Sequence, residues 1–83
     1  MSDYEKEIID LELRLVVFKK FEKPSRCTDL EDIRHYVHEL CITIEDYKKR
    51  FDYVPAFAYT LLSKYNARQN RILNNEFHNL YCS

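Results

Sequence analysis

The sequence predicts an all-α protein, a three-helix antiparallel bundle. The chain contains no glycine, and its two prolines, Pro24 and Pro55, divide it into three segments of similar length. Tight hairpin turns with positive φ favour glycine, so strands joined by such turns are not expected. In each segment apolar residues recur at intervals of three and four, which is the helical period. We expect helices over residues 3–23, 28–51 and 54–81.

The composition is that of a small globular protein for which a partner subunit would add stability. Hydrophobic residues make up 46% and charged residues 33% of the chain, which argues against wholesale disorder. A chain of this length forms one domain, residues 1–83, and buries only about 60–65% of the surface exposed by its unfolded form. The net charge of -1 gives no general reason to expect nucleic acid as a partner.

The cysteines and the first residues predict a cytoplasmic protein. Cys27, Cys41 and Cys82 form no pair at CxxC spacing, and an odd number of cysteines is unsuited to a disulfide framework. The chain starts with charged residues rather than the apolar stretch of a signal peptide. No apolar run approaches the ~18 residues that a membrane span requires, so we expect no membrane association.

The first predicted helix is apolar on two opposite sides. One narrow stripe has the spacing of a coiled-coil seam. It consists of Tyr4, Ile8, Leu11, Leu15 and Phe18. Because one stripe is sufficient in a three-helix monomer, we expect the second group to be a self-association surface of a homo-oligomer. That group consists of Ile9, Leu13, Val16 and Val17. Alternatively, the second group is scattered surface apolar residues among charges.

The second predicted helix has the most regular pattern and is expected to form the core. Thr28 and Glu31 have the spacing of a capping box, in which Thr28 caps the helix. The apolar positions then follow the helical period without a miss. They are Leu30, Ile33, Val37, Leu40, Ile44, Tyr47 and Phe51. Ile42 alone is expected on the opposite side.

The last predicted helix begins apolar and becomes rich in amides and arginines halfway along. Its inward stripe starts with Val54, Ala58, Leu61, Tyr65 and Ile72, and then drifts to Leu62, Leu73, Phe77 and Leu80. Its polar part offers stacking faces, guanidinium groups and amides to a partner protein or a nucleotide. These candidate binding residues are Tyr59, Asn66, Arg68, Asn70, Arg71, Asn74 and Asn75. The alternative is a neutral, solvated helix face.

The sequence contains no constellation that predicts catalysis, a cofactor or a metal. Phosphate-binding loops and nucleophile elbows require glycine. His35, His38 and Cys41 recur at intervals of three along one helix. A closed zinc site needs four ligands, and only His78 and Cys82 are left to complete one. We expect these histidines to be solvated or paired with glutamates and Cys41 to pack at the edge of the core, and we expect no enzyme activity.

The leading functional hypothesis is a small non-enzymatic interaction protein, a regulator that binds and inhibits or adapts another macromolecule. Seven tyrosines and five phenylalanines exceed what a small core needs, and tyrosine and arginine are enriched at binding surfaces. The alternative is a nucleotide or single-stranded nucleic-acid binding protein that uses the last helix. The size, the absence of glycine and the Tyr- and Asn-rich composition resemble those of phage or mobile-element proteins.

Overall fold

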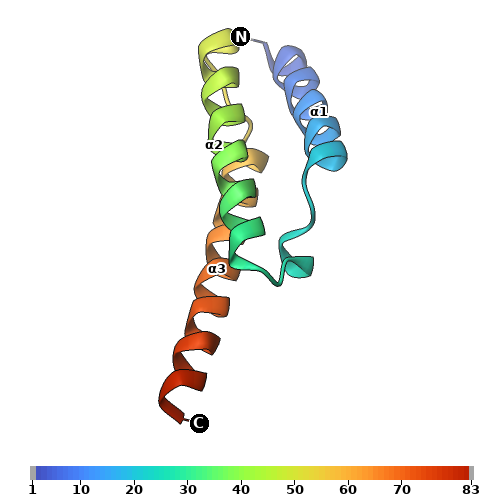
Figure 1. The fold of residues 1–83 in the computed structure, drawn as a ribbon. Helices are drawn as coiled ribbons and strands as arrows, with labels where there is room; N and C mark the ends of the chain where they lie inside the picture. Colours follow the sequence, from blue (N-terminus) through green and yellow to red (C-terminus); the bar gives the residue numbers. More distant parts are fainter. Residues whose placement is uncertain (1, 83) are drawn as a thin grey trace.

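The predicted all-α fold is confirmed: three helices pack against each other in the computed structural model. It describes the chain from Ser2 to Cys82, with side chains through Asn75, and this part contains no strand. The elements are α1 (Asp3–Lys20), a short 3-10 turn η1 (Pro24–Arg26), α2 (Leu30–Phe51) and α3 (Ala56–Cys82). Figure 1 shows α2 running antiparallel to its neighbours and α3 extending beyond the end of the other two helices.

A local cap begins α1, and a contact with α2 accompanies its end. The Ser2 hydroxyl accepts a hydrogen bond from the backbone N–H of Glu5, which satisfies one of the free donors of the first turn. The helix ends at Lys20, earlier than predicted, because Phe21 is extended and its ring lies 5.8 Å from that of Tyr36 on α2. The chain then enters η1 at Pro24, which disfavours helical geometry in the preceding residue.

The turns around α2 use aspartate rather than threonine or glycine. Thr28 was the predicted cap, but the N-cap is Asp29, whose carboxylate accepts a hydrogen bond of 3.0 Å from the N–H of Glu31. At the other end Asp52 adopts the left-handed conformation, with φ of 50°. Aspartate tolerates this conformation better than most residues, so the helix ends sharply without a glycine.

The core confirms the predicted stripes of α2 and of the first half of α3. Its buried residues come from all three helices and from the α1–α2 connection, residues 21–29. They are Ile9, Leu13, Cys27, Ile33, Leu40, Ile44, Tyr47, Ala58, Leu61 and Tyr65. Ile42 is exposed, as predicted, whereas Cys41 is exposed rather than packed at the core edge. Phe77 and Leu80, predicted for the later stripe, lie outside the residues whose side chains are described.

The two apolar sides of α1 are reversed relative to the prediction. Ile9 and Leu13 are buried in the core and Val16 and Val17 are half-buried, so Ile9 and Leu13 belong to the core rather than to an exposed self-association surface. The exposed residues are instead those of the seam-like stripe: Tyr4 72%, Ile8 47%, Leu11 62%, Leu15 62% and Phe18 85%. We call these five residues the α1 stripe.

The reason for the reversal lies at the end of the helix. Ile9, Leu13, Val17 and Phe21 follow one another at intervals of four, so they share one side of α1 and its continuation. Packing Phe21 against Tyr36 therefore turns Leu13 inward and leaves the opposite side in solvent. None of the described helices has a stretch that is long and apolar enough to cross a membrane.

This reversal predicts opposite effects for two leucines on the same helix. Leu13→Ala should lower the free energy of unfolding by about 2–5 kcal/mol, because it leaves a cavity in the core. Leu11→Ala should change it by less than about 0.5 kcal/mol, because Leu11 is exposed. Urea unfolding of both variants measures the difference. A larger loss for Leu11→Ala would contradict the observed orientation of α1.

Candidate functional site

Two side chains of α3 hold the α1–α2 connection in place. The Tyr65 hydroxyl donates a hydrogen bond to the carbonyl oxygen of Glu22. One turn further along, Arg68 Nε donates to the carbonyl oxygen of Cys27, at 2.8 Å. These bonds secure both ends of a segment that forms no regular pairing with another element, and so they set the position of η1 against α3.

The surroundings of Tyr65 are apolar and aromatic. Its side chain is fully buried, and its ring stacks on Tyr36 with the centroids 5.7 Å apart. Burial raises the pKa of Tyr65 far above its ordinary value, and the nearby Cys27 and Tyr36 raise it further. Burial also raises the pKa of the Cys27 thiol, with Glu22 adding to the effect. Both groups therefore stay neutral at physiological pH, as structural rather than reactive groups.

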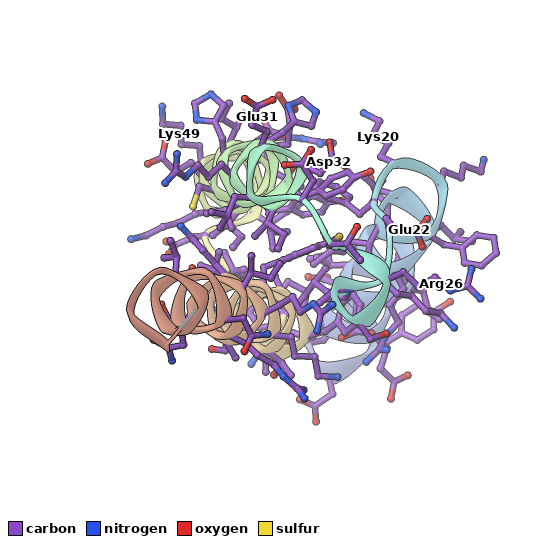
Figure 2. All side chains as sticks on the ribbon, turned by 60° about the horizontal axis from the view of Figure 1, so that its bottom comes forward. Lys20, Glu22, Arg26, Glu31, Asp32 and Lys49 are labelled. Atoms are coloured by element: carbon purple, nitrogen blue, oxygen red, sulfur yellow. The ribbon has the colours of Figure 1, made fainter. Side chains whose placement is uncertain are left out.

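A groove of about 870 Å³ lies between the C-terminal half of α1, the connection and α3. Its apolar floor includes Val17, Phe18, Phe21, Phe57 and Leu61. Around this floor stand six cationic side chains: Arg14, Lys23, Arg26, Lys64, Arg68 and Arg71. A single carboxylate, that of Glu22, lines the groove with them. Figure 2 shows Glu22 and Arg26 on the connection beside α1, seen from the end of the bundle where α3 protrudes.

The cationic side chains of the groove differ in whether they already form ion pairs or hydrogen bonds within the protein. Arg14 forms an ion pair with Asp10, and its guanidinium carbon lies 4.2 Å from the ring centroid of Phe57. Arg68 bonds to a neutral carbonyl and so keeps its full charge. The other four form no ion pair with any residue whose side chain is described. The groove therefore presents an apolar surface bordered by mostly uncompensated positive charge.

The α1 stripe is the second surface available for binding. It lies on the side of α1 opposite Ile9 and Leu13, because the two sets are half a helical turn apart. The charges along α1 are unevenly distributed. Residues 3–12 contain five carboxylates and one lysine, whereas residues 13–20 contain Arg14, Lys19 and Lys20 and no carboxylate. Phe18 belongs to the α1 stripe and also lines the groove, so the two surfaces adjoin.

The predicted binding residues of the last helix do not form one face. Arg68 and Arg71 line the groove, where they join residues of α1 and of the connection. Tyr59, Asn66 and Asn70 are exposed but do not line it, and their spacing places them together on another side of α3. The remaining two, Asn74 and Asn75, are exposed and lie outside the groove.

Sequence reasoning missed most of the groove. Lys64, Arg68 and Arg71 follow one another at intervals of four and three, so their common face was readable from the sequence. No local pattern links them to Lys23 and Arg26, because these residues are about 40 positions away and meet α3 only in the fold.

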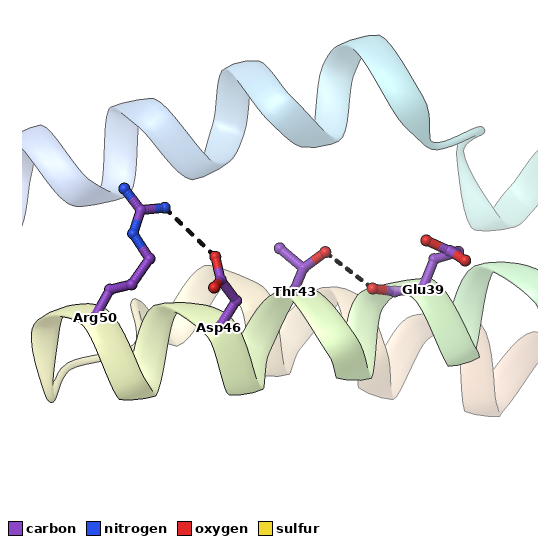
Figure 3. A network of polar contacts seen from close by, with 4 residues as sticks. All are labelled: Glu39, Thr43, Asp46 and Arg50. Atoms are coloured by element: carbon purple, nitrogen blue, oxygen red, sulfur yellow. Dashed lines mark hydrogen bonds and ion pairs between the residues drawn. The ribbon is translucent and has the colours of Figure 1, made fainter.

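One flank of α2 carries local polar interactions. The Thr43 hydroxyl donates to the Glu39 carbonyl oxygen at 2.9 Å, and Arg50 Nη1 forms an ion pair with Asp46 at 3.4 Å. Both contacts are drawn in Figure 3. Such pairs one turn apart stabilise a helix by only a few tenths of a kcal/mol. Among the described residues no cluster of three or more His, Cys, Asp and Glu side chains is arranged to hold a metal ion. His78 and Cys82, which the sequence offered as further ligands, lie outside the described side chains.

Comparisons with known proteins give no family assignment. No protein-family model, curated protein or solved structure matches the chain. The functional proposals therefore rest on the groove and the α1 stripe.

The anchoring role of Tyr65 predicts a stability loss with a characteristic pH dependence. Tyr65→Phe should lower the free energy of unfolding at pH 7 by about 1–3 kcal/mol, because the Glu22 carbonyl loses its donor. Tyr59→Phe, on the same helix and half-exposed, should have no measurable effect.

Unfolding at alkaline pH tests whether the Tyr65 hydroxyl is buried. Its pKa is raised in the folded state, so its contribution is complete below the unfolded value of about 10 and is lost as the pH rises above it. The wild type should therefore lose stability more steeply above pH 10 than Tyr65→Phe, in urea titrations at a series of pH values. Parallel pH profiles of the two proteins would contradict the buried hydrogen bond.

Proposed function

We propose that the protein is a non-enzymatic interaction protein that acts as a homo-oligomer and binds another macromolecule, which it inhibits or adapts. The observation that supports this best is the α1 stripe, five large apolar side chains facing solvent on the side of α1 away from the core. Exposing such side chains is costly, and their 4–3 spacing is that of helices that pair along a seam. We infer that a second copy covers the stripe.

The size of the stripe suits a weak dimer. Two aromatic and three aliphatic side chains at these exposures form a patch on the order of 600 Å², at the upper limit of what monomers expose. Pairing two copies would bury about 1,200 Å² in total, the lower limit for specific interfaces. We therefore expect association at tens of micromolar rather than an obligate complex.

The charges of α1 favour an antiparallel pair. In that orientation the acidic residues 3–12 of one copy lie along the basic residues 13–20 of the other. In a parallel pair with the α1 stripe as its seam, the flanking positions would bring Glu7 near Glu12 of the second copy. They would likewise bring Arg14 near Lys19. Like charges would then meet on both flanks, so the parallel pair is the less stable one.

A second candidate function is nucleotide or single-stranded nucleic-acid binding, favoured by Arg68 and Arg71 in the groove. For either function we propose a cytoplasmic protein, because three cysteines without a CxxC pair suit a reducing compartment. An origin in a phage or mobile element is proposed on composition alone.

Self-association is tested by placing charge in the α1 stripe. The purified protein should scatter light as a dimer at tens of micromolar, and Leu11→Glu/Leu15→Glu should be monomeric with an unchanged helical circular dichroism spectrum. Both leucines are exposed, so the substitutions remove the seam without entering the core.

Ile42→Glu is the matched control, because Ile42 is similarly exposed but lies on α2. This variant should dimerise as the wild type does. A wild-type protein that is strictly monomeric at these concentrations would contradict self-association. Equal dissociation by Ile42→Glu would show that the interface is not the α1 stripe.

A further inference from the structure

We propose that the groove between α1, the connection and α3 binds an amphipathic helix of a partner protein whose polar flanks are acidic. This inference rests on the proposed function, because it names the chemistry of the macromolecule that the interaction protein recognises. It uses a surface that shares only Phe18 with the α1 stripe. The argument depends on the floor of the groove, its charge and its aromatic rings.

The floor of the groove is suited to a large apolar ligand surface. Leu61 is buried at its base, Val17, Phe21 and Phe57 are half-buried along it, and Phe18 stands exposed at its edge. An isolated phosphate or carboxylate would leave these side chains uncovered. A row of apolar side chains from one face of a helix would cover them, as in other helix-in-groove complexes.

The six cationic side chains around the floor, which form its rim, would be matched by negative charge on both sides of that apolar row. Lys64, Arg68 and Arg71 stand on α3, while Arg14 on α1 and Lys23 and Arg26 on the connection stand across the floor. Among the residues whose side chains are described, the groove thus collects six of the chain's thirteen Lys and Arg residues and a single carboxylate. A ligand that matches the groove is apolar in the middle and acidic along both flanks, and an amphipathic acidic helix has this pattern.

The aromatic rings favour a protein ligand over a nucleic acid. Single-stranded nucleic acids bind by stacking successive bases on free aromatic faces. Here one face of Phe57 is covered by the Arg14 guanidinium, and Phe21 packs against Tyr36. Among the described rings lining the groove, Phe18 alone is largely exposed, and one ring is too few for a stacking platform. The cations would still attract phosphates, so an oligonucleotide is the appropriate competing probe.

The proposal is tested with a designed peptide of about 18 residues, long enough to form a helix. It carries leucine at intervals of three and four, glutamate and alanine elsewhere, and a fluorescent label for anisotropy titrations at physiological salt. The comparison probes are the same peptide with glutamine for glutamate and a labelled oligothymidylate of similar length. We expect saturable binding of the glutamate peptide and at least tenfold weaker binding of both other probes.

Lys64→Ala/Arg71→Ala should weaken binding of the glutamate peptide roughly tenfold, because two cations of the rim are lost. Lys48→Ala/Lys49→Ala changes the net charge equally, outside the groove, and should leave the affinity within about twofold. Circular dichroism confirms that both variants are folded.

Three results would overturn the proposal. They are no binding of the glutamate peptide, equal binding of the glutamine peptide, and equal loss in the two double variants. In the first of these cases, binding of the oligothymidylate alone would point to nucleic-acid recognition instead. The monomeric Leu11→Glu/Leu15→Glu protein should bind the peptide as the wild type does, because neither leucine lines the groove. A failure of self-association and a failure of the groove are therefore distinguishable.

Discussion

The hydrogen bonds from Tyr65 and Arg68 to the α1–α2 connection are the constraint on which the rest of the arrangement depends. Without them the carbonyl groups of Glu22 and Cys27 would have no fixed partner on α3. With them, η1 is held against α3, and the end of α1 is brought to the same place. Burial of the Tyr65 ring and its hydroxyl together makes this contact both apolar and directional, which few residue types achieve.

This contact also explains which of the two apolar sides of α1 is buried in the core. Phe21 directly precedes Glu22, so the hydrogen bond that holds the Glu22 carbonyl limits where Phe21 can lie. Phe21 packs on Tyr36. The residues at intervals of four before Phe21 then face the core. The α1 stripe remains exposed even though its spacing is the more regular. Regular spacing predicts that a helix can pack along this side, but it does not determine which element packs there.

The two surfaces that remain have different characters. The α1 stripe is apolar and lies on a helix whose charge changes sign along its length, which suits a copy of itself in the opposite direction. The groove combines a smaller apolar floor with a surplus of positive charge, which the carboxylates described there, Asp10 and Glu22, offset only in part. Their shared residue, Phe18, places the proposed site for a partner next to the proposed site for a second copy.

Periodicity and breakers were enough to predict three helices, the inward face of α2 and the outward position of Ile42, because these depend on neighbours within four residues. The sequence predicted Thr28 as the cap of α2 in place of its neighbour Asp29, because adjacent Thr and Asp side chains compete for the same N–H groups. The rotation of α1 and the groove needed the fold itself. Lys23 and Lys64 are far apart in sequence, and only the packing of the connection against α3 brings their charges to one site.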